Sequence, residues 1–269
     1  MLLKNTIAIL GCGWLGFPLA KSLINNGHVV NGSTTSEAKL KDLKAAGINP
    51  FLISLSENAT QGAIDELLKD VEIIVINVPP KLRGSNTENY VKKMELLHGA
   101  ISHAGIRKVV FVSSTSVYGD IEGEVAEDTD PKPSTESGRQ LLASENIFRE
   151  DDGLKTTIIR FGGLIGNERH PINMLSGKKN LSNGNHPINL IHLNDCIRII
   201  QSVIEKKWWD EIFNGVFPLH PKKKDYYTSE AKKRGLQVPD YKEDNSKIGK
   251  IVRSNRLISV KNHVFTTSL

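Results

Sequence analysis

Three glycines near the start of the chain have the spacing of a phosphate-binding turn. Gly11, Gly13 and Gly16 follow a short apolar run at residues 6–10 and precede a segment with the apolar spacing of a helix. In the pattern G-x-G-x-x-G the first glycine permits a tight turn, the second lets a pyrophosphate approach the backbone, and the third lets helix and strand pack closely. The following helix N-terminus favours the diphosphate charge. We therefore predict dinucleotide binding here, with further contacts from Trp14 and Leu15; the alternative is a glycine-rich turn without a ligand.

The residues after the second apolar run decide which dinucleotide fits. NAD-binding proteins commonly place an acidic residue there to hold the ribose 2′-hydroxyl, whereas this chain reads NGSTTS over residues 31–36, with Lys39 and Lys41 beyond. Hydroxyls and a helix N-terminus can bind a 2′-phosphate, and the absent carboxylate removes a repelling charge. We therefore predict NADP rather than NAD, bound in part by Ser33, Thr34 and Thr35. The alternative is that these hydroxyls only cap the next helix.

Alternating apolar and amphipathic segments must position this turn. Short apolar runs at residues 6–10, 28–32, 51–54, 71–78, 108–113 and 156–161 alternate with helical segments from residues 15 and 36 and around 64–68, 88–104 and 139–148. Such alternation predicts βαβ units, and runs that are apolar on both faces indicate a parallel sheet between helical layers. The predicted fold is α/β, a Rossmann-type doubly wound parallel sheet.

The alternation ends near Gly166. A passage rich in Gly, Asn and Pro runs to residue 187, and a helical segment near 195–206 and a mixed tail follow. We expect residues 1–165 to form the dinucleotide-binding Rossmann domain. Residues 166–269 are expected to form a small C-terminal substrate-binding lobe that contains elements returning to the sheet domain.

Composition narrows the class of protein. The 269 residues carry a net charge of +5, but 30 acidic residues are mixed with 35 basic ones, and we interpret the basic runs at 222–224 and 232–234 as solvated faces. The only cysteines, Cys12 and Cys196, are far apart and lack metal-ligand spacing, so we expect neither a disulfide nor a metal site. We also expect a cytoplasmic protein without a signal peptide or membrane span, and no nucleic-acid partner.

Further motifs resemble a known family. The segments KVVFVSSTSVYGD (108–120), IIRFGGLIG (158–166), RHP (169–171) and INLIHLND (188–195), together with GCGWLG, are similar to the extended or atypical short-chain dehydrogenases/reductases, which include NAD-dependent epimerases and dehydratases. The resemblance implies that Ser113 lies beneath the nicotinamide and Ser114 binds a substrate hydroxyl, with Tyr118 nearby. It also implies cofactor contacts from Asn77, Val78, Pro79, Phe161, Gly162 and Gly163.

One expected feature of that family is missing. Its chemistry relies on a tyrosine four residues before a lysine, at the start of the helix around 139–148, where this chain has Ser137 and Leu141. None of the five tyrosines is followed four residues later by lysine. A serine hydroxyl is a far weaker acid than a phenol, and loss of a general acid typically costs about two to four orders of magnitude in rate. Ordinary dehydrogenase activity should therefore be weak.

Three interpretations of this loss stay open. The proton donor is relocated, with Tyr118 as the first candidate and His170 or His192 as others; or the chain is a non-catalytic module that senses or presents NADP(H). In the third, Arg83, Arg169, His170 and His192 gather positive charge for an anionic sugar or nucleotide sugar, although surface ion pairing is the alternative for each arginine.

The resemblance also implies a partner. Members of the family often dimerise through two helices, which here are the segments 88–104 and 139–148. A homodimer would take apolar contacts from Leu96, Leu97, Ile101 and Leu142.

Overall fold

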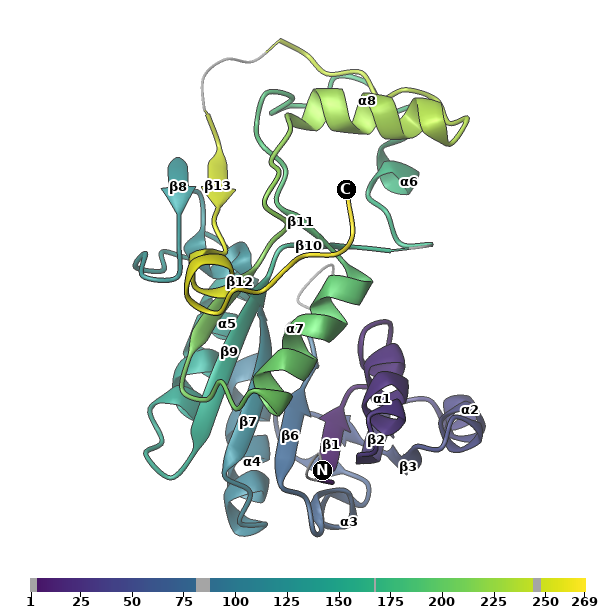
Figure 1. Ribbon diagram of the computed structural model, residues 1–269, viewed down its shortest axis with the longest axis vertical. Coiled ribbons are helices and arrows are strands. Elements are labelled where there is room, and N and C mark those ends of the chain that lie inside the picture. The colour runs from purple at the N-terminus through teal and green to yellow at the C-terminus, as the bar shows by residue number, and fades with distance from the viewer. Residues whose placement is uncertain (1–3, 81–87, 167, 244–247) are drawn as a thin grey trace.

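A parallel sheet forms the centre of the molecule. The computed structural model describes residues 4–80, 88–166, 168–243 and 248–269. Within them, a 7-stranded sheet has the order β12-β9-β7-β6-β1-β2-β3, and every neighbouring pair is parallel (Figure 1). The strands are β1 (Thr6–Leu10), β2 (Val29–Thr34), β3 (Asn49–Leu52), β6 (Ile73–Ile76), β7 (Lys108–Ser114), β9 (Lys155–Phe161) and β12 (Ile212–Gly215). The predicted doubly wound α/β fold is confirmed.

The strands are apolar on both faces because each face supports a separate core. In β1, Ile7 and Ile9 enter one core cluster, whereas Ala8 and Leu10 enter the other. Successive side chains of a strand point to opposite faces, so a strand between two helical layers must be apolar at nearly every position. This is why the apolar runs of the sequence lack a polar alternation.

Helices cover the two faces. On one face, α1 (Gly16–Asn25), α2 (Leu40–Ala45) and α7 (Leu193–Glu205) supply side chains to the first cluster. On the other, α3 (Ile64–Leu68), α4 (Tyr90–His103) and α5 (Glu136–Arg149) supply the second. The chain reverses its direction across the sheet between β1 and β6, and crevices for ligands lie at such switch points, beyond the carboxyl ends of the strands.

A smaller unit lies beyond that edge of the sheet. It contains α6 (Ile172–Leu175), α8 (Lys223–Lys233) and the parallel pair β10 (Gly163–Ile165) and β11 (Leu190–His192), around a third cluster rich in tyrosine (Figure 1). Residues 166–269 do not all belong to this lobe, because β12 pairs with β9 and α7 packs beside α1. The helix α8 lies in the segment that the sequence had indicated only as a mixed tail.

Short elements complete the fold. The strand β8 (Gly123–Val125) pairs in parallel with β13 (Lys250–Val252), so a C-terminal segment lies beside the loop that follows β7. The hairpin of β4 (Ser54–Leu55) and β5 (Thr60–Gln61) is antiparallel. Single turns η1 (Glu37–Lys39) and η2 (Thr115–Tyr118) follow β2 and β7, and the π-helical turn η3 (Arg256–Val260) lies near the C-terminus.

The residues expected at a dimer interface have different environments. Leu97 and Ile101 are fully buried in the chain's own core, which removes them from any surface, whereas Leu96 is 40% exposed and Leu142 is partly buried. The expected homodimer stays a prediction, and two of its proposed contacts are wrong.

Candidate functional site

The glycine turn is held by the ends of the neighbouring strands. Gly11 has φ +100°, a left-handed conformation that favours glycine. Its N–H donates to Ser33 Oγ at 2.9 Å, and its carbonyl accepts from Asn77 Nδ2 at 3.0 Å. The Cys12 N–H donates to the Ser33 carbonyl at 2.7 Å. The structure therefore brings together the predicted residues from β1, β2 and β6.

Each glycine of the motif has its own spatial reason. A Cβ on Gly11 would lie 2.6 Å from the Asn77 carbonyl oxygen, and one on Gly16 would lie 2.2 Å from the Gly11 carbonyl oxygen. A Cβ on Gly13 would meet nothing within 4 Å. Gly11 and Gly16 are thus needed for the turn itself, whereas Gly13 leaves exposed space at the N-terminus of α1, as close approach of a pyrophosphate requires. The residues present fit a dinucleotide.

The hydroxyls after β2 are divided between structure and solvent. Ser33 and Thr34 are buried; Ser33 binds the glycine turn, and Thr34 Oγ1 accepts from the Ser36 N–H at 3.2 Å. Thr35 is exposed. The helix expected from residue 36 begins as the short turn η1 before α2, so Thr35 is the hydroxyl of this group that faces solvent.

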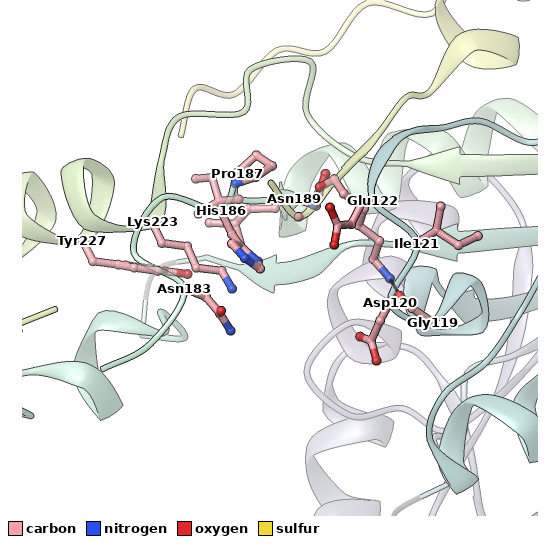
Figure 2. A pocket seen from close by; sticks show the side chains of 14 residues that line it. Gly119, Asp120, Ile121, Glu122, Asn183, His186, Pro187, Asn189, Lys223 and Tyr227 are labelled. Carbon is pink, nitrogen blue, oxygen red and sulfur yellow. Dashed lines mark hydrogen bonds between the residues drawn. The ribbon is translucent and has the colours of Figure 1, made fainter. Parts of the chain in front are cut away.

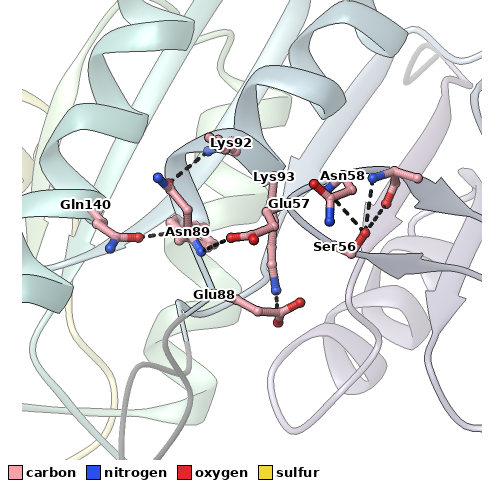
Figure 3. Close-up of polar contacts among 10 residues, drawn as sticks. Ser56, Glu57, Asn58, Glu88, Asn89, Lys92, Lys93 and Gln140 are labelled. Carbon is pink, nitrogen blue, oxygen red and sulfur yellow. Dashed lines mark hydrogen bonds and ion pairs between the residues drawn. The ribbon is translucent and has the colours of Figure 1, made fainter.

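The end of β6 is fixed by α4. The Tyr90 hydroxyl donates to the Val78 carbonyl at 2.7 Å, and the Tyr90 N–H donates to Gln140 Oε1 at 2.7 Å. Asn89 caps α4 by accepting from the Lys92 N–H at 3.1 Å, and its own N–H donates to Glu57 Oε2 at 2.9 Å (Figure 3). Side chains from three parts of the chain thus satisfy free N–H groups at this helix start.

A buried polar network lies under the ends of β7 and β9. The Ser113 hydroxyl donates to Glu145, whose carboxylate forms an ion pair with Arg160 at 2.6 Å, and both charged side chains are 2% exposed. Ser114 is partly exposed, and its hydroxyl accepts from the Ser116 N–H at 3.1 Å. Phe161 is buried, while Gly162 and Gly163 continue to the lobe, where the Gly163 N–H donates to the Asn189 carbonyl at 2.8 Å.

Tyr118 belongs to this buried network. Its side chain is fully buried, its hydroxyl donates to Asn214 Oδ1 at 2.9 Å, and Arg160 donates to it at 3.0 Å. Burial raises the pKa of Tyr118, while the charge of nearby Arg160 opposes that rise. The structure therefore places the first candidate for a relocated proton donor where its hydroxyl meets protein groups, not an open site.

At the helix start that should carry the missing pair, the tyrosine position is partly exposed and the lysine position is buried. Thr135 caps α5 by accepting from the Gly138 N–H at 3.1 Å, which places Ser137 in the first turn. Leu141 is 4% exposed and packs in the second core cluster. The position of the family lysine is thus filled by the protein core.

A cavity of about 680 Å³ begins next to η2, at residues 119–122. It lies between the segment after η2 and the lobe, and small-molecule sites commonly have volumes of about 300–1,000 Å³. Figure 2 shows Lys223 and Asn183 on the lobe side and Asp120 and Glu122 on the side of the sheet domain. The lining residues are Gly119, Asp120, Ile121, Glu122, Asn183, His186, Pro187, Ile188, Asn189, Leu190, Lys223, Tyr227, Gly249 and Lys250.

Two lysines of this lining had no role in the sequence prediction. Lys223 lies at the start of α8 and is partly buried, which corrects the interpretation of residues 222–224 as a wholly solvated run; Lys222 and Lys224 are exposed as expected. Burial lowers the pKa of Lys223. Lys250 Nζ donates to the Thr115 carbonyl at 3.2 Å and also to the Gly119 carbonyl. Neither residue lies in a recognisable motif, and only the packing of the lobe brings them to the cavity.

The predicted substrate residues lie elsewhere. The Arg169 guanidinium stacks on Trp14 at 4.9 Å, so it lies over the glycine turn. His170 is buried and shares a hydrogen bond of 2.9 Å with the Tyr226 hydroxyl, and burial lowers its pKa. His192 caps α7 by accepting from the Asn194 N–H at 3.2 Å. None of the three lines the cavity, and Arg83 lies outside the described residues.

Two other kinds of feature are absent from the described ranges. They contain no group of three or more His, Cys, Asp or Glu side chains arranged to hold a metal ion. They also contain no helix with the length and apolarity that crossing a membrane requires.

Comparison with known proteins agrees with this geometry. A family model described as NAD(P)H-binding matches residues 11–189. Protein YeeZ of Escherichia coli K12 is 35% identical over 254 residues, which cover 93% of this chain and 92% of YeeZ. A UDP-glucose 4-epimerase of Lacticaseibacillus casei is 28% identical over 62% of this chain and 56% of that enzyme.

A solved structure shares the fold. The UDP-glucuronic acid 4-epimerase of Bacillus cereus, solved with UDP-glucuronic acid and NAD, superposes with a TM-score of 0.78 at 20% identity, over 98% of this chain and 95% of that one. The glycine turn, the sheet order and these matches together show that the chain belongs to the NAD(P)H-binding family, among the extended short-chain dehydrogenases/reductases that include the NAD-dependent epimerases and dehydratases.

Proposed function

We propose that this chain binds NADP(H) at the glycine turn and acts, with low turnover, as an oxidoreductase or epimerase on a nucleotide sugar held in the cavity. The observation that carries the proposal is the cavity itself, which lies between the segment after η2 and the lobe and is lined by Lys223 and Lys250. A protein that only bound a dinucleotide at the glycine turn would not need this cavity in addition. The B. cereus epimerase of the same fold was solved with a UDP-sugar and NAD.

One group of residues would bind the dinucleotide and another the nucleotide sugar. Gly11, Gly13 and Gly16 would receive the diphosphate, and Asn77, Val78 and Pro79 would face the cofactor from the end of β6. Bound nicotinamide supplies or accepts hydride. Ser114, partly exposed at the end of β7, would hydrogen-bond the reacting substrate oxygen. Lys223 would bind a substrate phosphate, because its ammonium faces the cavity from the lobe.

The preference for NADP rests on the end of β2. Thr35 is exposed there, as are Lys39 and Lys41, and no carboxylate occupies residues 31–36. Thr35→Asp should weaken NADP binding by about tenfold or more and leave NAD binding much less affected, because it places a charge that repels the 2′-phosphate. Ser229→Asp, at an exposed site on α8, is the matched control.

The first experiment tests the cofactor site. Isothermal titration with NAD+, NADH, NADP+ and NADPH should give the tightest binding with an NADP form. Gly13→Glu should abolish that binding without lowering the melting temperature, because its side chain enters open space where the diphosphate would lie. Gly99→Glu is the control, since a Cβ on Gly99 also meets nothing within 4 Å. Undiminished binding by Gly13→Glu would contradict the proposed site.

The second experiment tests turnover. Proton NMR with UDP-glucose, UDP-glucuronic acid and UDP-N-acetylglucosamine detects epimerisation in the presence of bound dinucleotide. Slow epimerisation of one of them is expected, and its complete absence would remove the catalytic part of the proposal.

A second candidate function is a module that senses NADP(H) without turnover. Leu141 in the core and the enclosed Tyr118 hydroxyl favour it, because the position of the family lysine is closed and the first candidate for a relocated donor is enclosed. Binding of the dinucleotide without reaction of any of the three UDP-sugars would support this function over the first.

A further inference from the structure

Lys250 brings an ammonium to the end of β7 from a distant part of the chain. The strand β13 pairs with β8, with Lys250 opposite Gly123. From there Nζ donates to the carbonyls of Thr115 and Gly119. Thr115 is the first residue of the η2 turn and directly follows Ser114, and Gly119 is the residue after the turn. Lys250 also lines the cavity. Its ammonium therefore binds the backbone of the turn that follows Ser114, and the residue forms part of the cavity wall.

The ammonium retains capacity for a ligand. It has three N–H donors, and two bind the carbonyls of Thr115 and Gly119. Neither contact is with a carboxylate, so the charge is not neutralised by an ion pair there. Burial lowers the pKa of Lys250, with a smaller opposing effect from Asp120. An amine with a lowered pKa exchanges protons near neutral pH more readily than an ordinary lysine.

We propose that Lys250 is the proton-transfer residue that replaces the missing Tyr/Lys pair, with Nζ in contact with the reacting oxygen of the substrate. This inference rests on the proposed function, because it needs a nucleotide sugar in the cavity and a nicotinamide dinucleotide at the glycine turn. It assigns the chemistry to a residue outside the helix that normally carries it.

Lys250 would take up a proton when the substrate is oxidised and give it back when the carbonyl is reduced. In oxidation, neutral Lys250 takes the proton of the substrate hydroxyl, the C–H bond breaks with loss of hydride to an oxidised nicotinamide dinucleotide, and a carbonyl forms. In the return, the carbonyl carbon regains hydride from the reduced dinucleotide, and the oxygen takes the proton back from the Lys250 ammonium. The backbone carbonyls of Thr115 and Gly119 accept hydrogen bonds from Nζ and would hold it in place during both steps.

Other candidates have less suitable positions. The Tyr118 hydroxyl is enclosed by Arg160 and Asn214. Lys223 lines the cavity from α8, on the side of the lobe, and suits a substrate phosphate better than an oxygen beside Ser114. Lys250 combines contact with the η2 backbone and a place in the cavity wall.

Two substitutions separate proton transfer from a structural role. Lys250→Arg preserves a positive charge and hydrogen-bond donors for the two carbonyls, but a guanidinium does not deprotonate in proteins. Lys250→Met removes the charge and the donors together. We expect both variants to bind NADP+ like the parent chain, and Lys250→Arg also to bind UDP-glucuronic acid, measured by isothermal titration. Epimerisation should fall by about 100-fold or more in both.

Matched variants complete the test. Lys223→Met should raise KM for UDP-glucuronic acid and leave kcat largely unchanged, whereas Lys250→Arg should lower kcat. Tyr118→Phe should leave kcat within about an order of magnitude, because its hydroxyl does not meet the substrate.

Each outcome decides the proposal. If Lys250→Arg epimerises the UDP-sugar as fast as the parent chain, the proposal is overturned and Lys250 has a structural or charge role. Parent-like turnover by a folded Lys250→Met would overturn it in the same way. If the parent chain transforms none of the three UDP-sugars, the proposed function fails and this inference fails with it. Loss of turnover in Lys250→Arg with both ligands still bound would support it.

Discussion

The cofactor side of this molecule, around the glycine turn, and the proposed substrate side, around the cavity lined by Lys223 and Lys250, are built in different ways. The cofactor side consists of backbone geometry: Gly11 and Gly16 are excluded from carrying a side chain by carbonyl oxygens at 2.6 and 2.2 Å. The substrate side depends on side chains that arrive from separate segments, such as Lys250 from β13 and Lys223 from α8. A backbone turn leaves a local motif in the sequence, whereas a convergence of side chains does not.

The difference also concerns charge. The glycine turn holds no charged side chain of its own, while the floor under the end of β7 contains the buried pair of Glu145 and Arg160. We therefore expect the network under the end of β7 to be more sensitive to loss of one charge, and the glycine turn to be more sensitive to added volume.

The largest effect is expected for Arg160→Met. It leaves the Glu145 carboxylate buried without its partner, so the free energy of unfolding should fall by about 3–5 kcal/mol in urea denaturation. Arg139→Met is the control, because Arg139 pairs with Glu136 on the surface. This substitution should lower the free energy of unfolding by less than about 1 kcal/mol. Equal losses in the two variants would contradict the assigned importance of burial.

Gly16→Ala should come next, by adding volume to the cofactor side. Its Cβ would lie 2.2 Å from the Gly11 carbonyl oxygen, so the turn must shift, at an expected cost of about 1–3 kcal/mol. NADP binding by isothermal titration should be lost as well. Gly99→Ala, at an open helical site, should instead stabilise the chain by about 0.5–1 kcal/mol. A variant Gly16→Ala as stable as the parent chain would show that the turn tolerates a side chain.

Asn89→Ala tests whether the start of α4 supports the end of β6 on the cofactor side. The cap should contribute about 1 kcal/mol to the free energy of unfolding. Because Tyr90 in the first turn of the same helix binds the Val78 carbonyl at the end of β6, NADP affinity should fall slightly too. Asn194→Ala, at an exposed position of α7, is the control, and a loss there of the same size would count against capping.

The smallest effect is expected for Arg169→Ala. Stacking of the guanidinium on Trp14 should contribute about 0.5–1 kcal/mol, and its loss should change tryptophan fluorescence and the quenching of that fluorescence by NADPH. Arg198→Ala, also exposed, should leave both signals unchanged. Identical spectra for the two variants would argue against a contact between Arg169 and Trp14 in solution.

Much of the fold could be predicted from the sequence because its signals are local. The first strand, predicted at residues 6–10, is Thr6–Leu10, and the helix predicted around 64–68 is Ile64–Leu68. Continuous apolar runs correctly indicated strands buried on both faces at β1 and β6, whereas the run at 51–54 falls on the edge strand β3, Asn49–Leu52, which has no buried residue. The helix α8 was not predicted, because it is rich in lysine and lacks a clear apolar face. Its buried residues include Tyr226, Tyr227 and the charged Glu230.

The candidate site divides along the same line. The sequence by itself determined the phosphate turn, the polar residues at the strand ends and the absence of the Tyr/Lys pair, because each depends on the spacing of neighbouring residues. Only the tertiary structure decided that Tyr118 and His170 are enclosed, that Arg169 lies on Trp14, and that Lys250 reaches the carbonyl of Thr115. Spacing along a chain fixes local backbone geometry, but burial and long-range contacts depend on how distant segments pack, and no short motif encodes that packing.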